Sequence, residues 1–217
     1  MGARDGGAQD AARNGSQVTV ASPYLSGSET LASSLRHVLS RKVRNDQPGV
    51  GKDPKVILLT ASPLSNAFQG STGAASLVPD LYASLLRRFI QRLGKGNHQP
   101  KGLEVALYAR EGWTMHAKGL WISGAPSPGA DQRFSVVGMG SGNGGYRTEN
   151  LDLECNVYVE SGVGHGYVGG GVPGANHEMK RLLAWTYSDG TFPSKNRSNG
   201  YREVLISLLT RLVARLM

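Results

Sequence analysis

The 217-residue sequence predicts an α/β fold in which helices sandwich a mixed β-sheet. Amphipathic stretches of helical length alternate along the chain with short apolar stretches of strand length. The run KVILLTA at 55–61 is apolar along most of its length, as is typical of a strand buried on both faces. We find no internal repeat, so these elements should build a single lobe.

The first part of the chain should contain a lead, a strand and a helix. Residues 1–16 are rich in Gly, Ala and Arg, which predicts a disordered lead before a folded lobe at 17–217. Alternation of apolar and polar residues predicts a strand at 17–22. A helix is expected over 28–43, with Ser28 as its N-cap, because a serine hydroxyl can accept a hydrogen bond from a first-turn amide.

The central part supplies further elements of both kinds. The run at 55–61 is the expected second strand, and a helix should follow Pro79, since proline suits the first helical turn. Four more strands are predicted at 103–109, 113–122, 134–139 and 151–160.

The C-terminal part should hold two helices. A glycine-rich loop at 161–175 precedes a predicted helix at 177–185. The last helix, at 201–217, has apolar residues that repeat with the helical period: Val204, Leu205, Leu208, Leu209, Leu212, Val213 and Leu216. Such a basic amphipathic helix either docks on its own lobe or lies on an anionic membrane surface, and the sequence leaves both open.

Composition narrows the class of partner. The formal net charge of +8 favours anionic partners such as nucleic acid, phosphorylated metabolites or anionic lipid surfaces. The single cysteine, Cys155, excludes an intrachain disulfide and argues against a thiolate zinc cluster. No apolar run approaches the roughly 18 to 20 residues that span a bilayer, so any membrane contact should be peripheral. Residues 1–17 lack the apolar segment of a secretory signal.

The first candidate motif is the HxK pair His116 and Lys118 within the predicted strand 113–122. Side chains alternate along a strand, so the two should point to the same side. A histidine can attack phosphorus or transfer a proton, and a neighbouring lysine can neutralise phosphoryl charge in the transition state. An isolated HxK is uninformative, so the inference depends on what accompanies it.

The second motif, GSGNGGYR at 140–147, follows a predicted strand. Ser141 and Asn143 offer a hydroxyl and an amide that can bind phosphate oxygens, and the glycines allow the backbone to approach an anion closely. On its own the segment could equally be a glycine-rich hairpin loop.

The third motif is the acidic segment 151–157. Asp152, Glu154 and Asn156 should share one face of the predicted strand, where a carboxylate could orient an imidazole. The alternatives are a solvated strand face or an ion pair of an acidic residue with Arg147. The opposite face is interpreted as core and carries Leu153, Cys155, Val157 and Val159.

Together the three motifs resemble those of the phospholipase D superfamily. The segments GWTMHAKGLW at 112–121 and GSGNGGYRTENLDLE at 140–154 are similar to the second catalytic motif of the mitochondrial-type phosphatidylglycerophosphate synthases. The upstream segment LLTASPLSNAFQGSTGAASLVP at 58–79 resembles the loop between the two motifs of that family. The resemblance runs from about Val18 to Glu160.

The resemblance implies a phospholipase D-like lobe of a two-lobed enzyme that moves a phosphatidyl group from CDP-diacylglycerol to glycerol 3-phosphate and releases CMP. It implies no metal and no cofactor. His116 would be one of two facing histidines, of which one attacks phosphorus and the other protonates the leaving group. Lys118 and Asn143 would bind the phosphate, and Ser141 would support them.

Two departures from the superfamily pattern matter. The aspartate usually found five residues after the lysine is Ser123 here, as in that enzyme branch, so Glu154 or Asp152 would supply the carboxylate. The family uses two motifs per site, and only one is present. A complete site would need an N-terminal lobe absent from this sequence, or a homodimer that places two copies of His116 face to face.

Substrate contacts and location follow only as expectations. Tyr146, Arg147 and the 62–73 loop are candidates for nucleotide or headgroup contacts. An anionic membrane surface is the expected partner, and the resemblance implies a position peripheral to the mitochondrial inner membrane, although no transit peptide is visible. Two other functions stay open: a different phosphodiesterase or nuclease of the superfamily, or a non-catalytic half-domain. No nucleic-acid partner is expected, because no nucleic-acid-binding module is recognisable.

Overall fold

The computed structural model of the chain describes residues 15–41, 53–94, 99–124, 133–161, 171–187 and 200–216. Almost all of the expected lead lies outside these ranges, as does most of the glycine-rich loop expected at 161–175. The helices are α2 (Glu29–Ser40), α3 (Val78–Leu93), α4 (Tyr146–Asn150), α5 (Ala175–Leu183) and α6 (Gly200–Leu216), with short 3-10 turns η2 (Pro63–Ser65) and η3 (Gly73–Leu77). The strands are β1 (Gln17–Ala21), β2 (Lys55–Ala61), β3 (Leu103–Tyr108), β4 (Gly119–Ser123), β5 (Val136–Gly140), β6 (Asn156–Glu160) and β7 (Thr186–Tyr187).

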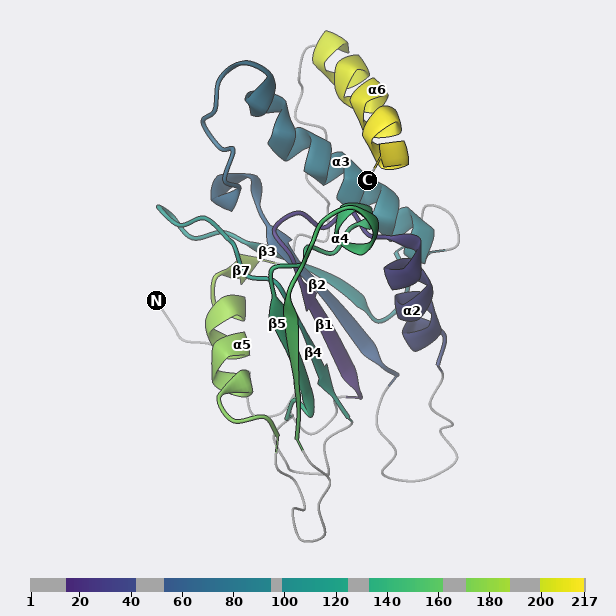
Figure 1. The fold of residues 1–217 in the computed structure, drawn as a ribbon, viewed down its shortest axis with the longest axis vertical. Coiled ribbons are helices and arrows are strands. Elements are labelled where there is room, and N and C mark those ends of the chain that lie inside the picture. Colours follow the sequence, from purple (N-terminus) through teal and green to yellow (C-terminus); the bar gives the residue numbers. More distant parts are fainter. Residues whose placement is uncertain are drawn as a thin grey trace, which may run out of the picture.

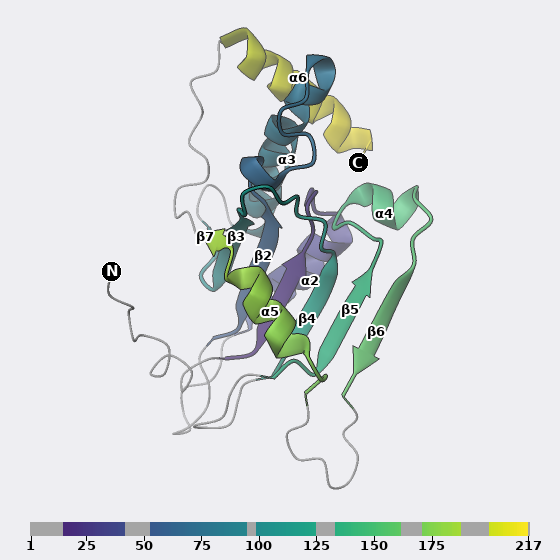
Figure 2. The ribbon, with the colours of Figure 1, turned by 90° about the vertical axis from the view of Figure 1, so that its left-hand side faces the viewer.

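All seven strands belong to one mixed sheet, in the order β6-β5-β4-β1-β2-β3-β7. The strands β1, β2 and β3 are parallel, whereas β4, β5, β6 and β7 each run antiparallel to their neighbours. In Figure 1 the helices α2 and α3 lie on one side of this sheet and α5 on the other, and Figure 2 shows the same layers from the side. The predicted α/β fold with a mixed sheet between helices is confirmed.

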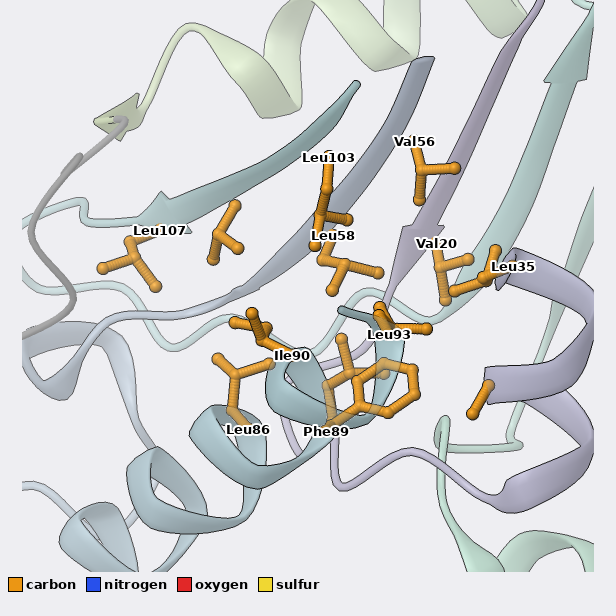
Figure 3. Packing of buried hydrophobic residues seen from close by; sticks show 13 residues of the cluster. Val20, Leu35, Val56, Leu58, Leu86, Phe89, Ile90, Leu93, Leu103 and Leu107 are labelled. Carbon is orange, nitrogen blue, oxygen red and sulfur yellow. The ribbon is translucent and has the colours of Figure 1, made fainter. Parts of the chain in front are cut away.

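Each face of the sheet has its own hydrophobic core, because alternate strand residues point to opposite faces. The first core joins β1, β2 and β3 to α2 and α3, and includes Val20, Leu58 and the fully buried Phe89 (Figure 3). The second joins the opposite strand face to α5, and includes the fully buried Trp121 and Met179. Burial of β2 on both faces explains the continuous apolar run predicted as a central strand.

The two helices of the first core begin as their sequences predict. The Ser28 hydroxyl accepts a hydrogen bond from the Leu31 amide at 3.1 Å, which confirms Ser28 as the N-cap of α2. Pro79 lies in the first turn of α3, where its missing N–H costs nothing. The loop before α2 therefore ends at a defined point.

Two strand predictions were too long at their N-terminal ends. The strand expected at 113–122 begins only at Gly119, so His116 and Lys118 lie on the loop between β3 and β4 rather than on a strand. The strand expected at 151–160 begins only at Asn156. In both cases the candidate catalytic residues lie just before the strand, where the backbone does not yet pair with a neighbouring strand.

The interpretation of one β6 face as core was wrong. Leu153 is fully exposed, and Val157, Val159 and Cys155 are also exposed. Since β6 is the outer strand of the sheet, only β5 pairs with it among the described residues. Alternation of apolar and polar residues shows that the two faces of a strand differ in polarity. It does not show that other residues cover the apolar face.

The last helix packs against α3, as one of the two interpretations of its stripe predicted (Figure 1). Thr210 is fully buried, and its hydroxyl donates to the Ile206 carbonyl at 2.5 Å. Three members of the predicted apolar stripe, Val204, Leu205 and Leu208, are instead exposed. The helix thus docks on the lobe while part of its apolar surface faces outward.

Candidate functional site

The register of the sheet brings the three motifs to one end of it. Ala21 at the end of β1 pairs with Gly119 at the start of β4. Gly119 in turn pairs with Met139 near the end of β5, and Met139 with Val157 at the start of β6. The segments that immediately follow β1 and β5 and precede β4 and β6 must therefore meet at the same edge.

The HxK pair is in direct contact at this edge. The Lys118 ammonium lies 3.4 Å from Nδ1 and 3.2 Å from Nε2 of His116, and it donates to the His116 carbonyl oxygen at 3.3 Å. The imidazole is exposed and Lys118 is half-buried. The two side chains thus meet on one side of the backbone, as predicted, although a loop and not a strand places them there.

Lys118 carries a perturbed pKa. Burial lowers the pKa of its ammonium below the usual lysine range, and the negative charge of Glu154 partly opposes this shift. The carboxylate is therefore close enough to act electrostatically on the lysine. Perturbed pKa values are common at functional sites.

Glu154 is held by the serine of the second motif. The Ser141 hydroxyl donates to a Glu154 carboxylate oxygen at 2.5 Å and accepts from the Cys155 amide at 3.0 Å. Thr148 donates weakly to the other carboxylate oxygen, at 3.5 Å. Ser141 consequently fixes the Glu154 carboxylate, which joins the second and third motifs.

Asn143 is anchored to the end of β1 through a residue that the sequence did not single out. The Ser22 hydroxyl, which is fully buried, donates to the Asn143 side-chain oxygen at 3.3 Å and accepts from the Gly144 amide at 3.2 Å. The Gly27 amide donates to the Gly144 carbonyl at 2.8 Å. The only available signal was the position of Ser22 directly after a strand, where site residues commonly lie.

Close packing explains why glycine occupies the start of the second motif. A Cβ atom on Gly140 would lie 2.2 Å from the side-chain oxygen of Asn156 and 2.3 Å from the Cys155 carbonyl. That same Asn156 oxygen accepts from the Gly142 amide at 3.3 Å. Asn156 therefore supports the 140–145 loop through contacts with Gly140 and Gly142. Its place in the sequence, two residues after Glu154, did not reveal this role.

The 62–73 loop is attached to the HxK loop by Ser65. The fully buried Ser65 hydroxyl accepts from the Arg110 amide at 3.1 Å, and its carbonyl accepts from the Met115 amide at 2.9 Å. The guanidinium of Arg110 stacks on the rings of Trp113 and Trp185, 3.9 and 4.7 Å from their centroids. The backbone just before His116 is thus held on two sides.

The remaining candidates lie on and after α4. Arg147 forms a bidentate pair with Asp152, at 2.7 and 3.2 Å, which is the ion-pair alternative considered for the acidic segment. Hydrogen bonding to Arg147 lowers the pKa of Asp152. Tyr146 is exposed and lines a cavity between α2 and α3. Asp152 is thus paired with Arg147, whereas the Glu154 carboxylate is bonded by Ser141.

The described residues show neither a metal cluster nor a membrane span. Within those ranges, no three His, Cys, Asp or Glu side chains gather as a metal ion would require. Among the helices that the structure describes, none combines the length and apolar character needed to cross a bilayer.

Sequence comparison relates the chain to lipid transferases. No protein-family model matches it. It is 35% identical over 146 residues to a "Probable CDP-diacylglycerol--glycerol-3-phosphate 3-phosphatidyltransferase" of Dictyostelium discoideum, covering 67% of this chain and 22% of that protein. The human mitochondrial enzyme of that name is 35% identical over 104 residues, covering 47% and 17%. The Saccharomyces pastorianus enzyme is 32% identical over 109 residues, covering 47% and 21%.

Structural comparison agrees on the fold. A phosphatidylserine synthase of Haemophilus influenzae superimposes with a TM-score of 0.62 over 91% of this chain and 39% of its own, at 19% identity. The chain spans about a fifth of the length of the curated relatives it matches. It is therefore a homologue of part of the CDP-diacylglycerol–glycerol-3-phosphate 3-phosphatidyltransferases, with the phospholipase D-like α/β fold of a phosphatidylserine synthase.

Proposed function

We propose that this chain supplies one half of a phosphatidyl-transfer site, which moves a phosphatidyl group from CDP-diacylglycerol to glycerol 3-phosphate. The observation that carries the proposal is the contact between His116 and Lys118, at the same end of the sheet as the Ser141–Glu154 pair. The names of the sequence relatives support the same two substrates. A nuclease of the same superfamily has no comparable support among them.

The proposed chemistry proceeds in two displacements. A histidine nitrogen attacks the phosphatidyl phosphorus, and the bond to the CMP oxygen breaks while a second histidine protonates that oxygen. A hydroxyl of glycerol 3-phosphate then loses its proton to the second histidine and attacks phosphorus, which frees the first. His116 takes one of these roles. Lys118 and Asn143 bind the phosphoryl oxygens, whose charge shifts during each step.

The site as described needs a second histidine. Apart from His116, the described histidines are His37, in the last turn of α2, and His177, in the first turn of α5, which pack on opposite faces of the sheet. We therefore propose that a second lobe, or a second copy of this chain, completes the site. Exposed apolar side chains near Glu154 support such a partner: Met139, Leu151, Leu153, Val157 and Val159.

The test is a transfer assay with the purified chain in mixed micelles of CDP-diacylglycerol and glycerol 3-phosphate, together with its mass in solution. Transfer by a dimer supports two facing copies of His116. An inactive monomer that becomes active when a lobe carrying a second HxK motif is added supports the two-lobed arrangement. Absence of transfer in both preparations contradicts the proposed function.

In a plot of transfer rate against pH, Lys118→Arg should move the decline on the alkaline side to higher pH. The protonated ammonium binds the phosphoryl group, and burial lowers its pKa, so wild-type activity should decline at a lower pH than an ordinary lysine would allow. A guanidinium stays charged throughout this range. Lys101→Arg, at an exposed lysine paired with Asp53, is the matched control and should leave the profile unchanged. Identical alkaline limbs in wild type and Lys118→Arg would remove Lys118 from phosphate binding.

We also propose that the lobe contacts an anionic membrane surface through the outward side of α6, peripheral to the mitochondrial inner membrane. Val204, Leu205 and Leu208 are exposed there, close to the exposed cation Arg211. Apolar side chains that lie beside cations suit the boundary between headgroups and acyl chains. The human relative is named as mitochondrial, which supports the compartment.

Leu208→Glu should weaken binding to vesicles rich in anionic phospholipid by about tenfold, because a charge replaces a buried apolar contact at the interface. The thermal midpoint should not change, since Leu208 is exposed in the lobe. Vesicle sedimentation measures the first effect and calorimetry the second. Ser207→Glu adds the same charge at an exposed neighbour and should reduce binding less. Equal losses in both variants would show a charge effect alone and no contact by Leu208.

A further inference from the structure

An open groove begins at the candidate site and follows the face of the sheet on which α2 packs. It has a volume of about 350 Å³. Asn143 and the rest of the 142–145 loop line it, together with Leu31 of α2 and residues of β1, β4, β5 and β6. Because Asn143 is the proposed contact of the phosphoryl group, a ligand in this groove would lie next to that group.

The floor of the groove is a row of residues that crosses the sheet. Val20 on β1 pairs with Leu120 on β4, Leu120 with Gly138 on β5, and Gly138 with Tyr158 on β6. Val20 is buried in the first core, so the row continues the apolar face on which α2 packs. The Tyr158 ring lies across Gly138, since a Cβ atom on Gly138 would be 2.6 Å from a ring carbon. The row is therefore apolar from end to end.

The apolar face extends away from the site and is elongated along the strands. Ile122 and Val136 pair with each other two positions further along, point to the same face and are half-buried. In Figure 2 β5 and β6 extend past α2 and α5 at one edge of the sheet. Four residue steps along β6, from Asn156 to Glu160, span about 13 Å. An elongated apolar surface of this kind suits an alkyl chain better than a compact polar group.

The polar side chains of the groove lie at its site end and bond to groups of the chain itself. The Asn156 side-chain oxygen accepts from the Gly142 amide at 3.3 Å. The Glu149 carboxylate accepts from the Ser28 hydroxyl at the N-terminus of α2. Asn143 is bonded to Ser22, as described above. A ligand that extends along the groove beyond these residues would therefore contact mainly hydrocarbon surface.

We propose that this groove holds an acyl chain of the phosphatidyl group, an inference that rests on the proposed transfer function. The reacting phosphorus of CDP-diacylglycerol carries a charged nucleotide on one side and diacylglycerol on the other. With the phosphoryl oxygens at Lys118 and Asn143, the apolar groove that begins at Asn143 matches the diacylglycerol side. A chain held there orients the phosphorus toward His116 before the reaction.

A segment of the second lobe, or of a second copy, is the competing occupant of the groove. The exposed apolar side chains that we assign to that partner include Val157 and Val159 on β6. Side chains alternate along a strand, so these two point away from Tyr158 and toward the opposite face of the sheet. The partner surface and the groove are therefore on different faces, and the groove face is left for the lipid.

Titration of the purified chain with parinaric acid, a fluorescent fatty acid, tests the groove without requiring transfer. The wild-type chain should bind the probe and raise its fluorescence. Tyr158→Asp should weaken binding about tenfold, because a carboxylate would have to be buried against the acyl chain. Val157→Asp is the matched control: Val157 is 59% exposed against 65% for Tyr158, but it lies on the opposite face, so binding should not change. Equal affinities in all three proteins, or equal losses in the two variants, would overturn the proposal.

Tyr158→Leu separates binding from folding. Leucine keeps an apolar side chain over Gly138, so this variant should bind parinaric acid within about twofold of the wild-type affinity. A loss as large as that of Tyr158→Asp would show that the ring has only a structural role, and would overturn the proposal. Probe that binds the monomer but is released when the chain dimerises, or when a second lobe is added, would show that protein covers the groove, with the same consequence.

Transfer assays distinguish failure of this inference from failure of the proposed function. In the active assembly, the ratio of kcat/KM for dipalmitoyl to dihexanoyl CDP-diacylglycerol should fall about tenfold in Tyr158→Asp, because the longer chain occupies more of the groove. Val157→Asp should keep the wild-type ratio even if weaker assembly lowers both rates. An unchanged ratio in an active Tyr158→Asp would overturn the acyl groove and leave the proposed function intact. Absence of transfer with either substrate would contradict the proposed function, and the parinaric acid titration would still decide whether the groove holds an acyl chain.

Discussion

His116→Asn should abolish phosphatidyl transfer, by about 10³-fold or more, in whichever assembly of the chain is active. A side chain that attacks phosphorus or transfers a proton has no substitute in an asparagine amide of similar size. Because the imidazole is exposed and its described contacts are with Lys118, the free energy of unfolding should change by less than about 0.5 kcal/mol.

The matched control is His177→Asn on α5. His177 lies on an element that packs on the other core of the sheet, away from the HxK loop, so its replacement should leave transfer unchanged. Radiolabelled product formation measures transfer, and urea unfolding followed by circular dichroism measures stability. Transfer retained by His116→Asn would exclude the imidazole from the mechanism, even if Lys118 still bound the phosphate.

In a homodimer the same substitution has a sharper consequence. If two copies of His116 face each other, a mixed dimer of wild type and His116→Asn has one histidine and cannot supply both nucleophile and acid. Activity in a mixture should then fall more steeply than the fraction of wild-type chain. If an N-terminal lobe supplies the second histidine, activity should fall in simple proportion. The mixing curve therefore distinguishes the two proposed assemblies.

Much of the site could be predicted because it depends on local rules. A buried central strand at 55–61, a serine N-cap at Ser28 and a proline in the first turn of α3 each leave a short-range signal, and the structure has all three. The convergence of the motifs also follows from chain order, since segments that flank adjacent strands meet at one edge of a sheet. The contact between His116 and Lys118 is also local, because the two residues are only two positions apart.

What could not be predicted depends on tertiary context. The apolar face of β6 and the outward side of α6 have the same periodicity as buried elements, because periodicity reports a difference between faces and not which of them is covered. The link from Ser22 to Asn143 joins residues 121 positions apart, and a single serine after a strand does not indicate its partner. The pairing of Arg147 with Asp152 was likewise one of several alternatives that the sequence left open.

Gly27→Ala should destabilise the lobe by about 2 to 4 kcal/mol, because the methyl group meets both backbone strain and a clash in the core. Gly27 has φ of +66°, a left-handed conformation that costs other residues about 1 kcal/mol. A Cβ atom there would lie 1.9 Å from the ring of Phe89, which is fully buried in the first core. Because Phe89 is enclosed by α2, α3 and the sheet (Figure 3), it cannot move without disturbing that core, which adds about 1 to 3 kcal/mol.

Gly70→Ala isolates the backbone contribution to this loss. Gly70 has φ of +77°, but no atom lies within 4 Å of the position that an alanine methyl group would take, so only the conformational cost of about 1 kcal/mol should appear. The difference between the two variants in urea unfolding measures the clash with Phe89. Phe89→Leu combined with Gly27→Ala should lose less stability than the sum of the single changes, since a smaller side chain relieves the contact.

The Gly27→Ala substitution should also change the structure of the candidate site. The Gly27 amide donates to the Gly144 carbonyl at 2.8 Å, so a displaced Gly27 moves the loop that presents Asn143. Transfer should therefore fall in Gly27→Ala even at temperatures where the lobe remains folded. Gly174→Ala, at a glycine before α5 with φ of +77° and no atom within 4 Å of the added methyl group, should keep its activity. Equal activity in Gly27→Ala and Gly174→Ala would mean that Phe89 and the 140–145 loop accommodate the methyl group, and that the tight packing between the first core and the site has no functional consequence.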